Sequence, residues 1–191
     1  MLSIALVCAC AFHATAADGP PALHRLTHDG RFKQRPAWSP DGKHLVVARH
    51  QGAKIALVVM AADGSGETVV SAGKFPEYDA CWSADSRRLA FTHVSQSGTQ
   101  GNLDVYLAMA DGSDPQKFAG DQGMLSHEEY PAWSPDGKRI AWSSTSEGNQ
   151  ELYVASVDGS NRLRLTNDPA IDAHPAWSPD GTKIAFATNR W

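Results

Sequence analysis

One heptapeptide, Pro-Ala-Trp-Ser-Pro-Asp-Gly, stands at residues 36–42 and recurs with small changes at residues 80–86, 131–137 and 175–181. Its four tryptophans, Trp38, Trp82, Trp133 and Trp177, are 44, 51 and 44 residues apart. Self-similarity at a period of about 20–50 residues is typical of solenoids and propellers, and these spacings match one propeller blade. The heptapeptide therefore predicts a repeat protein of about four blades, with the tryptophans in the core between neighbouring blades.

Each copy of the heptapeptide predicts two antiparallel strands joined by a tight turn. In Ser39-Pro40-Asp41-Gly42 the proline presets φ, the aspartate can accept hydrogen bonds from the backbone, and the glycine adopts the positive φ that closes the hairpin. A short apolar run follows, as in Ile140-Ala141-Trp142, which is typical of a strand buried on both faces. A second turn, Asp-Gly at residues 63–64, 111–112 and 158–159, predicts a further hairpin. Each period thus carries four antiparallel strands, A to D, and the fold class is an all-β propeller.

The second copy departs from this pattern at its turn. Ala84 replaces the proline and Ser86 replaces the glycine. A residue other than glycine in the left-handed conformation costs about 1 kcal/mol or more. We therefore expect this hairpin to be the least stable of the four, or to use another turn.

The repeat divides residues 18–191 into blades at about 33–72, 77–119, 128–167 and 172–191, the last of them partial. Leu26 precedes Trp38 by the same spacing that separates Leu165 from Trp177. Residues 23–27 are therefore expected to form a closing or orphan D strand, without strands A, B and C of their own. Such an incomplete propeller exposes a strand edge, through which the chain could self-associate.

The first 17 residues predict a signal peptide and an exported protein, periplasmic or secreted. They contain no Lys, Arg, Asp or Glu, and a nearly continuous apolar run leads to Ala14-Thr15-Ala16, the small residues that a signal peptidase needs. A buried N-terminal strand or helix is the alternative, as is lipidation at Cys10. Cleavage would leave Cys81 as the one thiol, which we expect to be buried and inert. No later segment is apolar over the length of a membrane span.

Composition and motifs argue against two classes of function. The chain has 17 Lys and Arg against 21 Asp and Glu, with a net charge of −4, and the two signs are interleaved rather than clustered. The sequence therefore lacks the basic patch that would predict a nucleic-acid partner. The sequence also contains neither a Gly-x-Ser-x-Gly elbow nor a glycine-rich phosphate loop, so it predicts a non-enzymatic protein.

The alternation of the strands separates two ends of each blade. The stereotyped A–B and C–D turns share one end, and the B–C loops and D–A connections share the other, which we call the top face. Length variation lies at the top face, which favours it as a binding surface. The residues three and five positions before each tryptophan differ from copy to copy and should ring the channel mouth: Lys33, Arg35, Glu77, Asp79, Glu128, Tyr130, Asp172 and His174.

These polar residues suggest a protein or peptide partner and no cofactor. The alternative is a divalent cation near the axis, since carboxylates suit calcium and imidazoles suit transition metals. The candidates for such a site are Asp79, His127, Glu128 and His174.

The repeat resembles that of TolB-like β-propellers, from Leu23 to the end of the chain. The resemblance rests on Pro-Ala-Trp-Ser-Pro-Asp-Gly-Lys-x-Ile-Ala at residues 131–141, followed by Leu-Tyr-Val-Ala, Asp-Gly and Leu-Thr. It implies a bacterial cell-envelope propeller, although only part of one, because the family's propellers usually close with six or more blades and TolB carries an additional N-terminal α/β domain. Similar blades form the gate of prolyl-oligopeptidase-type peptidases and resemble the blades of metal-dependent oligosaccharide lyases. A fragment of such an enzyme is therefore the alternative to a non-enzymatic binding protein. A purely structural module of the cell envelope is a third possible function.

Overall fold

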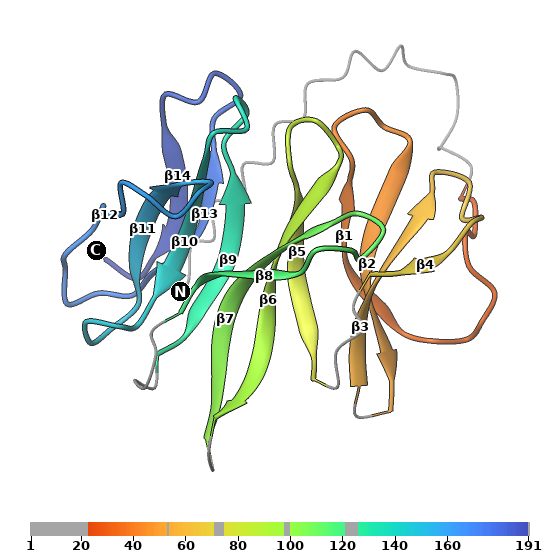
Figure 1. Cartoon of the computed structure of the whole chain (residues 1–191), viewed down its shortest axis with the longest axis horizontal. Coiled ribbons are helices and arrows are strands. Elements are labelled where there is room, and N and C mark those ends of the chain that lie inside the picture. The colour runs from red at the N-terminus through yellow and green to blue at the C-terminus, as the bar shows by residue number, and fades with distance from the viewer. Residues whose placement is uncertain (1–22, 53, 71–74, 98–99, 121–125, 191) are drawn as a thin grey trace.

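The computed structural model describes residues 23–52, 54–70, 75–97, 100–120 and 126–190 (Figure 1). The signal peptide predicted at residues 1–17 lies outside these ranges. All regular secondary structure in the described ranges is β, and they contain no helix long and apolar enough to cross a membrane.

The strands form three four-stranded antiparallel sheets and one two-stranded sheet, each following the order of the sequence. In Figure 1 the sheets succeed one another as blades of an arc, from β1–β4 at the right to β13 and β14 at the left. Blade 1 consists of β1 (Lys33–Trp38), β2 (His44–Gln51), β3 (Lys54–Ala61) and β4 (Thr68–Val69). Blade 2 consists of β5 (Glu77–Trp82), β6 (Arg88–Ser97), β7 (Gln100–Met109) and β8 (Gln116–Ala119).

Blade 3 consists of β9 (Glu128–Trp133), β10 (Arg139–Ser144), β11 (Glu151–Ser156) and β12 (Leu163–Arg164). Blade 4 consists of β13 (Asp172–Trp177) and β14 (Ile184–Thr188). The expected fold class is confirmed: an incomplete β-propeller with three full blades and one partial blade.

Each Ser-Pro-Asp-Gly turn is closed by its own side chains. In blade 1 the Ser39 hydroxyl donates to Asp41 (2.6 Å) and accepts from the His44 backbone N–H (2.9 Å), while Gly42 N–H donates to the Ser39 carbonyl. The same bonds recur in the other three blades. Ser86 keeps this turn in blade 2 and adopts φ 59°, close to the 71° of Gly42. Blade 2 therefore has the same type of turn as the other blades, with Ser86 in a backbone conformation that favours glycine.

The Asp-Gly turns hold the C–D hairpins, and two of them pack against a preceding segment of the chain. A Cβ on Gly112 would lie 2.4 Å from the Val70 carbonyl oxygen of blade 1, and one on Gly64 would lie 2.1 Å from the carbonyl oxygen of Leu26. Glycine is required at both positions because the backbone of another segment fills the place of a side chain.

Residues 23–27 do not form the expected D strand. Their backbone has no strand assignment, although Leu26 contacts Gly64 in the way that Val70 of blade 1 contacts Gly112 of blade 2. The segment thus occupies the place of a preceding blade's last strand. None of the described sheets contains a strand that pairs with it.

The core lies between blades, and the repeated tryptophans help to build it. Trp82 packs with Val46 and Ala48 of blade 1, and its Nε1 donates to the Ala37 carbonyl (3.0 Å). Trp177 repeats that bond to the carbonyl of Ala132 in blade 3 (3.0 Å). A tryptophan therefore belongs to one blade and packs on the blade before it.

This direction of packing explains where the prediction of four core tryptophans is wrong. Trp82 and Trp133 are 7% and 8% exposed, and Trp177 is half-buried, but Trp38 is 57% exposed. Trp38 projects from blade 1, and none of the described sheets lies on that side for it to pack against.

Candidate functional site

The innermost strands β1, β5, β9 and β13 lie side by side, and each contains a β-bulge. The residue three positions before the tryptophan sits in the bulge with a left-handed backbone: Arg35 (φ 53°), Asp79 (56°), Tyr130 (55°) and His174 (55°). Bulges redirect side chains, and left-handed residues other than glycine are strained by about 1–3 kcal/mol each. We call these four residues the axial cluster.

The axial cluster lines one shallow hollow of about 270 Å³ where the four strands meet. Arg35 forms an ion pair with Asp79. The Tyr130 and His174 rings lie with their centroids 3.6 Å apart, tilted by 33°. The Arg35 guanidinium carbon is 5.9 Å from the centroid of the Tyr130 ring and 5.6 Å from that of Tyr78. Four side chains distant in sequence thus form one contiguous surface.

The surroundings set the charges of this surface. Burial, followed by the positive charge of Arg35, lowers the pKa of His174, so its imidazole is neutral at neutral pH. Burial is also the main reason that the pKa of Tyr130 and that of Glu129 are raised. The Oδ2 atom of Asp79 is buried and accepts no hydrogen bond within the described ranges. The hollow therefore offers two rings and a guanidinium, whereas the Asp79 carboxylate is covered and paired with Arg35.

The residues five positions before each tryptophan lie elsewhere. Glu77, Glu128 and Asp172 are at most 4% exposed and point into their own blades. Glu77 lies 2.9 Å from His93 Nδ1, Glu128 accepts from the Ser144 hydroxyl (2.9 Å), and Asp172 pairs with Arg190. Lys33 pairs with Asp29 in the segment before β1. The structure thus brings together four of the eight residues proposed from the sequence.

The bulge explains this separation. Residues two apart share a face in a regular strand, so the sequence predicts one common surface for both sets. The bulge separates the two sets, so the side chains of the axial cluster no longer share a face with the residues two positions before them. Pro36, Pro131 and Pro175 are the signal that could have shown it, because proline inside a sheet is confined to edges and bulges.

The four candidate metal ligands do not form one site, although Asp79 and His174 line the same hollow. Asp79 pairs with Arg35, His174 stacks on Tyr130, Glu128 is enclosed by serines, and His127 is exposed. In the part of the chain that the structure describes, no three His, Cys, Asp or Glu side chains are placed to hold a metal ion.

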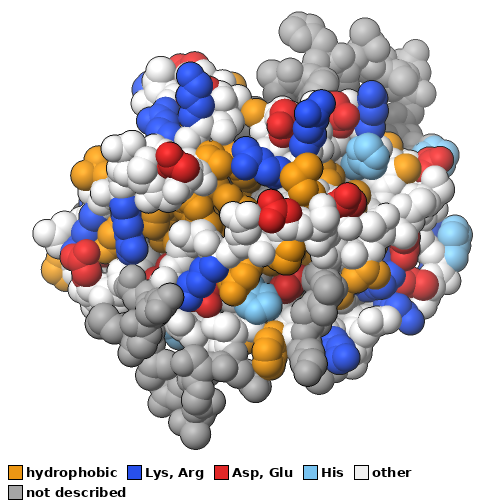
Figure 2. All heavy atoms as spheres, viewed as in Figure 1, with side chains coloured by type: hydrophobic (Ala, Val, Ile, Leu, Met, Phe, Trp, Pro, Cys, Tyr) orange, Lys and Arg blue, Asp and Glu red, His pale blue; other side chains and the backbone are white. Residues whose placement is uncertain are grey.

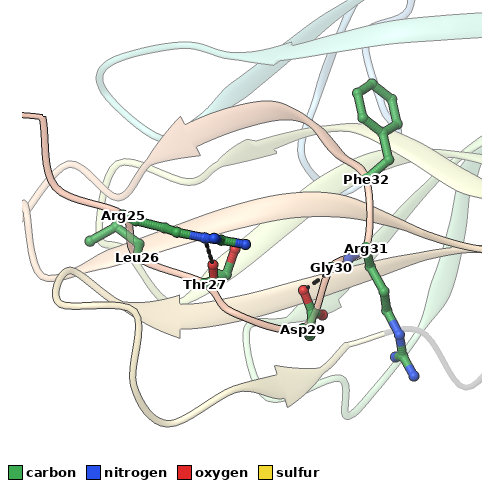
Figure 3. A pocket seen from close by; sticks show the side chains of 7 residues that line it. All are labelled: Arg25, Leu26, Thr27, Asp29, Gly30, Arg31 and Phe32. Carbon is green, nitrogen blue, oxygen red and sulfur yellow. Dashed lines mark hydrogen bonds between the residues drawn. The ribbon is translucent and has the colours of Figure 1, made fainter.

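A second hollow lies along the segment that leads into β1 (Figure 3). Its polar groups bond within that segment: Arg25 Nε donates to the Thr27 carbonyl (2.8 Å), and the Arg31 backbone N–H donates to Asp29 (3.2 Å). In the view of Figure 2 positive and negative side chains are interspersed, without a large patch of one sign. The axial cluster is therefore the better candidate site.

Comparison with known proteins identifies the family. Residues 80–191, more than half of the chain, match the family model described as the TolB beta propeller domain. The chain belongs to this family. As a member of the TolB propeller family it is also similar to the crystal structure of TolB from Acinetobacter baumannii, with a TM-score of 0.68 and 22% identity, over 84% of this chain and 39% of that one. It therefore spans well under half the length of that TolB.

Two peptidases are also similar to this chain. Dipeptidyl-peptidase 5 of Porphyromonas gingivalis is 31% identical over 70 residues, which are 35% of this chain and 10% of the peptidase. A puromycin-hydrolyzing peptidase of Mycobacterium tuberculosis gives a TM-score of 0.67 at 17% identity, over 83% of this chain and 28% of that one. At these structural identities the likeness establishes the propeller fold alone.

Proposed function

We propose that this chain is a non-enzymatic, exported propeller of the cell envelope that binds a protein or peptide segment at the axial cluster. The observation that carries the proposal is that one strained backbone position, repeated in four blades, presents four different side chains to a single hollow. A position needed only for folding would repeat its residue, as the tryptophans do. Strained positions that converge on a concave surface are typical of binding sites.

The chemistry of the hollow suits an extended peptide. The Arg35 guanidinium, whose side chain is 45% exposed, can donate to a peptide carbonyl oxygen, and the paired rings of Tyr130 and His174 offer a surface for an apolar or aromatic side chain. The cluster lies two residues into the innermost strands from the top face, where the B–C loops could add further contacts. Export, to the periplasm or out of the cell, rests on the predicted signal peptide.

A displayed library of extended peptides, selected on the purified protein, tests the proposal. Selected peptides are then measured by calorimetry against the wild type, His174→Ala and the control Lys138→Ala, which changes an exposed residue at the opposite, turn-bearing end. We expect His174→Ala to weaken binding by about tenfold or more, as for a central contact residue, and Lys138→Ala to leave it unchanged. Failure to select any peptide, or equal affinities for both variants, would refute the proposed site.

The second candidate is the propeller part of a peptidase, and the identity with dipeptidyl-peptidase 5 favours it. In that case the axial cluster would contact substrate on its way to a catalytic domain. Sequencing the reading frame beyond residue 191 decides between the two: a following Gly-x-Ser-x-Gly domain would support the peptidase. A lyase-like metal site is a weaker candidate, since no three of the proposed ligands are placed together in the described structure.

A further inference from the structure

In two of the contacts between successive blades, an arginine of the earlier blade lies over the tryptophan of the later one. The arginine stands six positions after the tryptophan of its own blade. In blade 2 it is Arg88, whose guanidinium carbon lies 4.9 Å from the Trp133 ring centroid. In blade 3 it is Arg139, whose guanidinium carbon lies 4.5 Å from the Trp177 ring centroid. Both are cation–π contacts.

The contact between blades 3 and 4 also shows what else holds such a guanidinium. Arg139 Nη2 donates to the carbonyl of Gly181 (3.4 Å), the last residue of the Ser-Pro-Asp-Gly turn that follows Trp177. One ring and one turn carbonyl of the later blade therefore bind the guanidinium. Between blades 1 and 2 the equivalent groups are the Trp82 ring and the carbonyl of Ser86.

Blade 1 carries His44 in place of this arginine. The His44 ring centroid is 6.3 Å from that of Trp82, and the two rings are tilted by 35°. An imidazole is shorter than an arginine side chain and lacks its planar fork of N–H donors. Beside His44 there is a hollow of about 250 Å³, lined among others by Trp82, Ser86, Thr68 and Asp111. The hollow thus contains the equivalents of both groups that hold Arg139.

Two exceptions to the repeat meet in this hollow. His44 stands where blades 2 and 3 have arginine, and Ser86 stands where the turns of the other three blades have glycine. Ser86 keeps a left-handed φ of 59°, at a cost that glycine would avoid. Strained positions that line a hollow are typical of binding sites.

The accessible polar groups of the hollow suit a positively charged donor. Hydrogen bonds led by that from the Ser113 hydroxyl lower the pKa of Asp111, so its exposed carboxylate is ionised at neutral pH. The hydroxyls of Ser86 and Thr68 and the Ser86 carbonyl supply further acceptors. A carboxylate, an indole ring and several acceptors therefore surround one space.

We propose that this hollow is a second binding site, which takes the guanidinium of an arginine side chain from a partner protein. The guanidinium would lie beside Trp82 and donate to the Ser86 carbonyl and the Asp111 carboxylate. The contacts within the chain provide the precedent for this ligand. The hollow lies at the turn-bearing end of the blades, so the site is separate from the axial cluster and does not depend on the peptide binding proposed there.

Nuclear magnetic resonance tests the proposal with a minimal arginine ligand. N-acetylargininamide is titrated into isotope-labelled protein, and the Trp82 indole N–H, which donates to the Ala37 carbonyl of blade 1, reports on the contact between the two blades. We expect a saturable shift with a dissociation constant of about 10 mM or lower, as for one cation–π contact and one charged hydrogen bond. N-acetylcitrullinamide, which has a similar shape without the charge, should give no saturable shift. N-acetyllysinamide should bind several-fold more weakly, because an ammonium lacks the planar fork.

Three variants locate the bound ligand. His44→Arg supplies a guanidinium from within the chain, as blades 2 and 3 do, and should abolish the shift. Asp111→Asn removes the carboxylate and should raise the dissociation constant about threefold or more. The matched control is Asp63→Asn, because Asp63 bonds Ser65 as Asp111 bonds Ser113 but lies outside the hollow. It should leave the constant unchanged, and circular dichroism confirms that each variant is folded.

Several results would overturn the proposal. One is the lack of a saturable Trp82 shift at about 50 mM ligand, five times the expected constant. Others are equal binding of the citrulline or lysine compound, and a folded His44→Arg variant that binds like the wild type. If His44→Arg does not fold, Asp111→Asn and the citrulline compound still decide. Equal weakening by Asp111→Asn and Asp63→Asn would also overturn it, because the ligand would then respond to general negative charge rather than to the hollow.

Discussion

Replacing Ser86 by glycine should stabilise the protein, because Ser86 holds a glycine conformation without being glycine. Its φ of 59° compares with 71°, 69° and 67° for Gly42, Gly137 and Gly181 in the same turn of the other blades. The substitution relieves the contact between Cβ and the backbone that makes this conformation costly, by about 1 kcal/mol.

The gain is partly offset by a hydrogen bond between blades. The Ser86 hydroxyl accepts from the backbone N–H of Asp41 at 3.2 Å, and this long, exposed bond contributes about 0.5 kcal/mol. The net gain for Ser86→Gly is therefore about 0.5 kcal/mol. Ser86→Ala loses the same hydrogen bond and keeps the strain, so it should be about 1 kcal/mol less stable than Ser86→Gly.

Urea denaturation of the wild type and both variants, monitored by far-ultraviolet circular dichroism, measures these differences. Thermal melting provides a second measurement, in which 1 kcal/mol corresponds to about 2–4 °C for a chain of this size. The comparison of glycine with alanine is decisive because the hydrogen bond cancels. If Ser86→Gly is no more stable than Ser86→Ala, residue 86 is not left-handed and the assignment of the turn is wrong.

Three further outcomes are expected. Gly112→Ala should destabilise the protein by about 2–3 kcal/mol, because the new Cβ would meet the Val70 carbonyl oxygen at 2.4 Å. Gly137→Ala should cost only about 1 kcal/mol, since its Cβ would meet only the Ala84 Cβ, at 3.6 Å. Denaturant titration compares the stability of the two variants. Burial raises the pKa of the Cys81 thiol to about 12, so peptide mapping should find Cys81 unmodified by iodoacetamide at pH 8 in the folded protein and modified after denaturation. Hydrogen bonds, first among them that from the Ser178 hydroxyl, lower the pKa of Asp180 to about 2. The ionised carboxylate therefore stabilises the fold above the usual pKa near 3.8, and this contribution is lost as the pH falls toward 2. Between pH 5 and pH 2 the melting temperature should fall less steeply for Asp180→Asn than for the wild type.

The strands and turns were predictable because local chemistry decides them. Ser39 and Asp41 close their turn with their own side chains, so the heptapeptide contains the information that forms the hairpin. The burial of Trp38 was not predictable from the same heptapeptide, since it depends on whether a neighbouring blade covers the ring. The irregular backbone of residues 23–27 has a similar cause: the spacing of Leu26 indicates a strand, but a strand also needs a partner.

The candidate site was predictable only in part. The sequence identifies Arg35, Asp79, Tyr130 and His174 as irregular residues at equivalent positions, and the arc brings them to one hollow. It also placed Glu77 and its three equivalents at the same mouth, because an alternating strand puts both sets on one face. The bulge that separates them is a property of the backbone, indicated only by the prolines that follow three of the bulged residues. The role of either set in binding stays a prediction.

The way in which each blade packs on its predecessor has a consequence for how such a protein changes in evolution. A single repeat encodes both a tryptophan for the blade before it and a docking surface for the blade after it, as Trp82 with Ala37 and Trp177 with Ala132 show. Duplication of one repeat in the gene therefore inserts a unit that fits its neighbours on both sides, and deletion lets the flanking units meet in the same geometry. Blade number can thus change in whole steps while the contacts between blades are conserved.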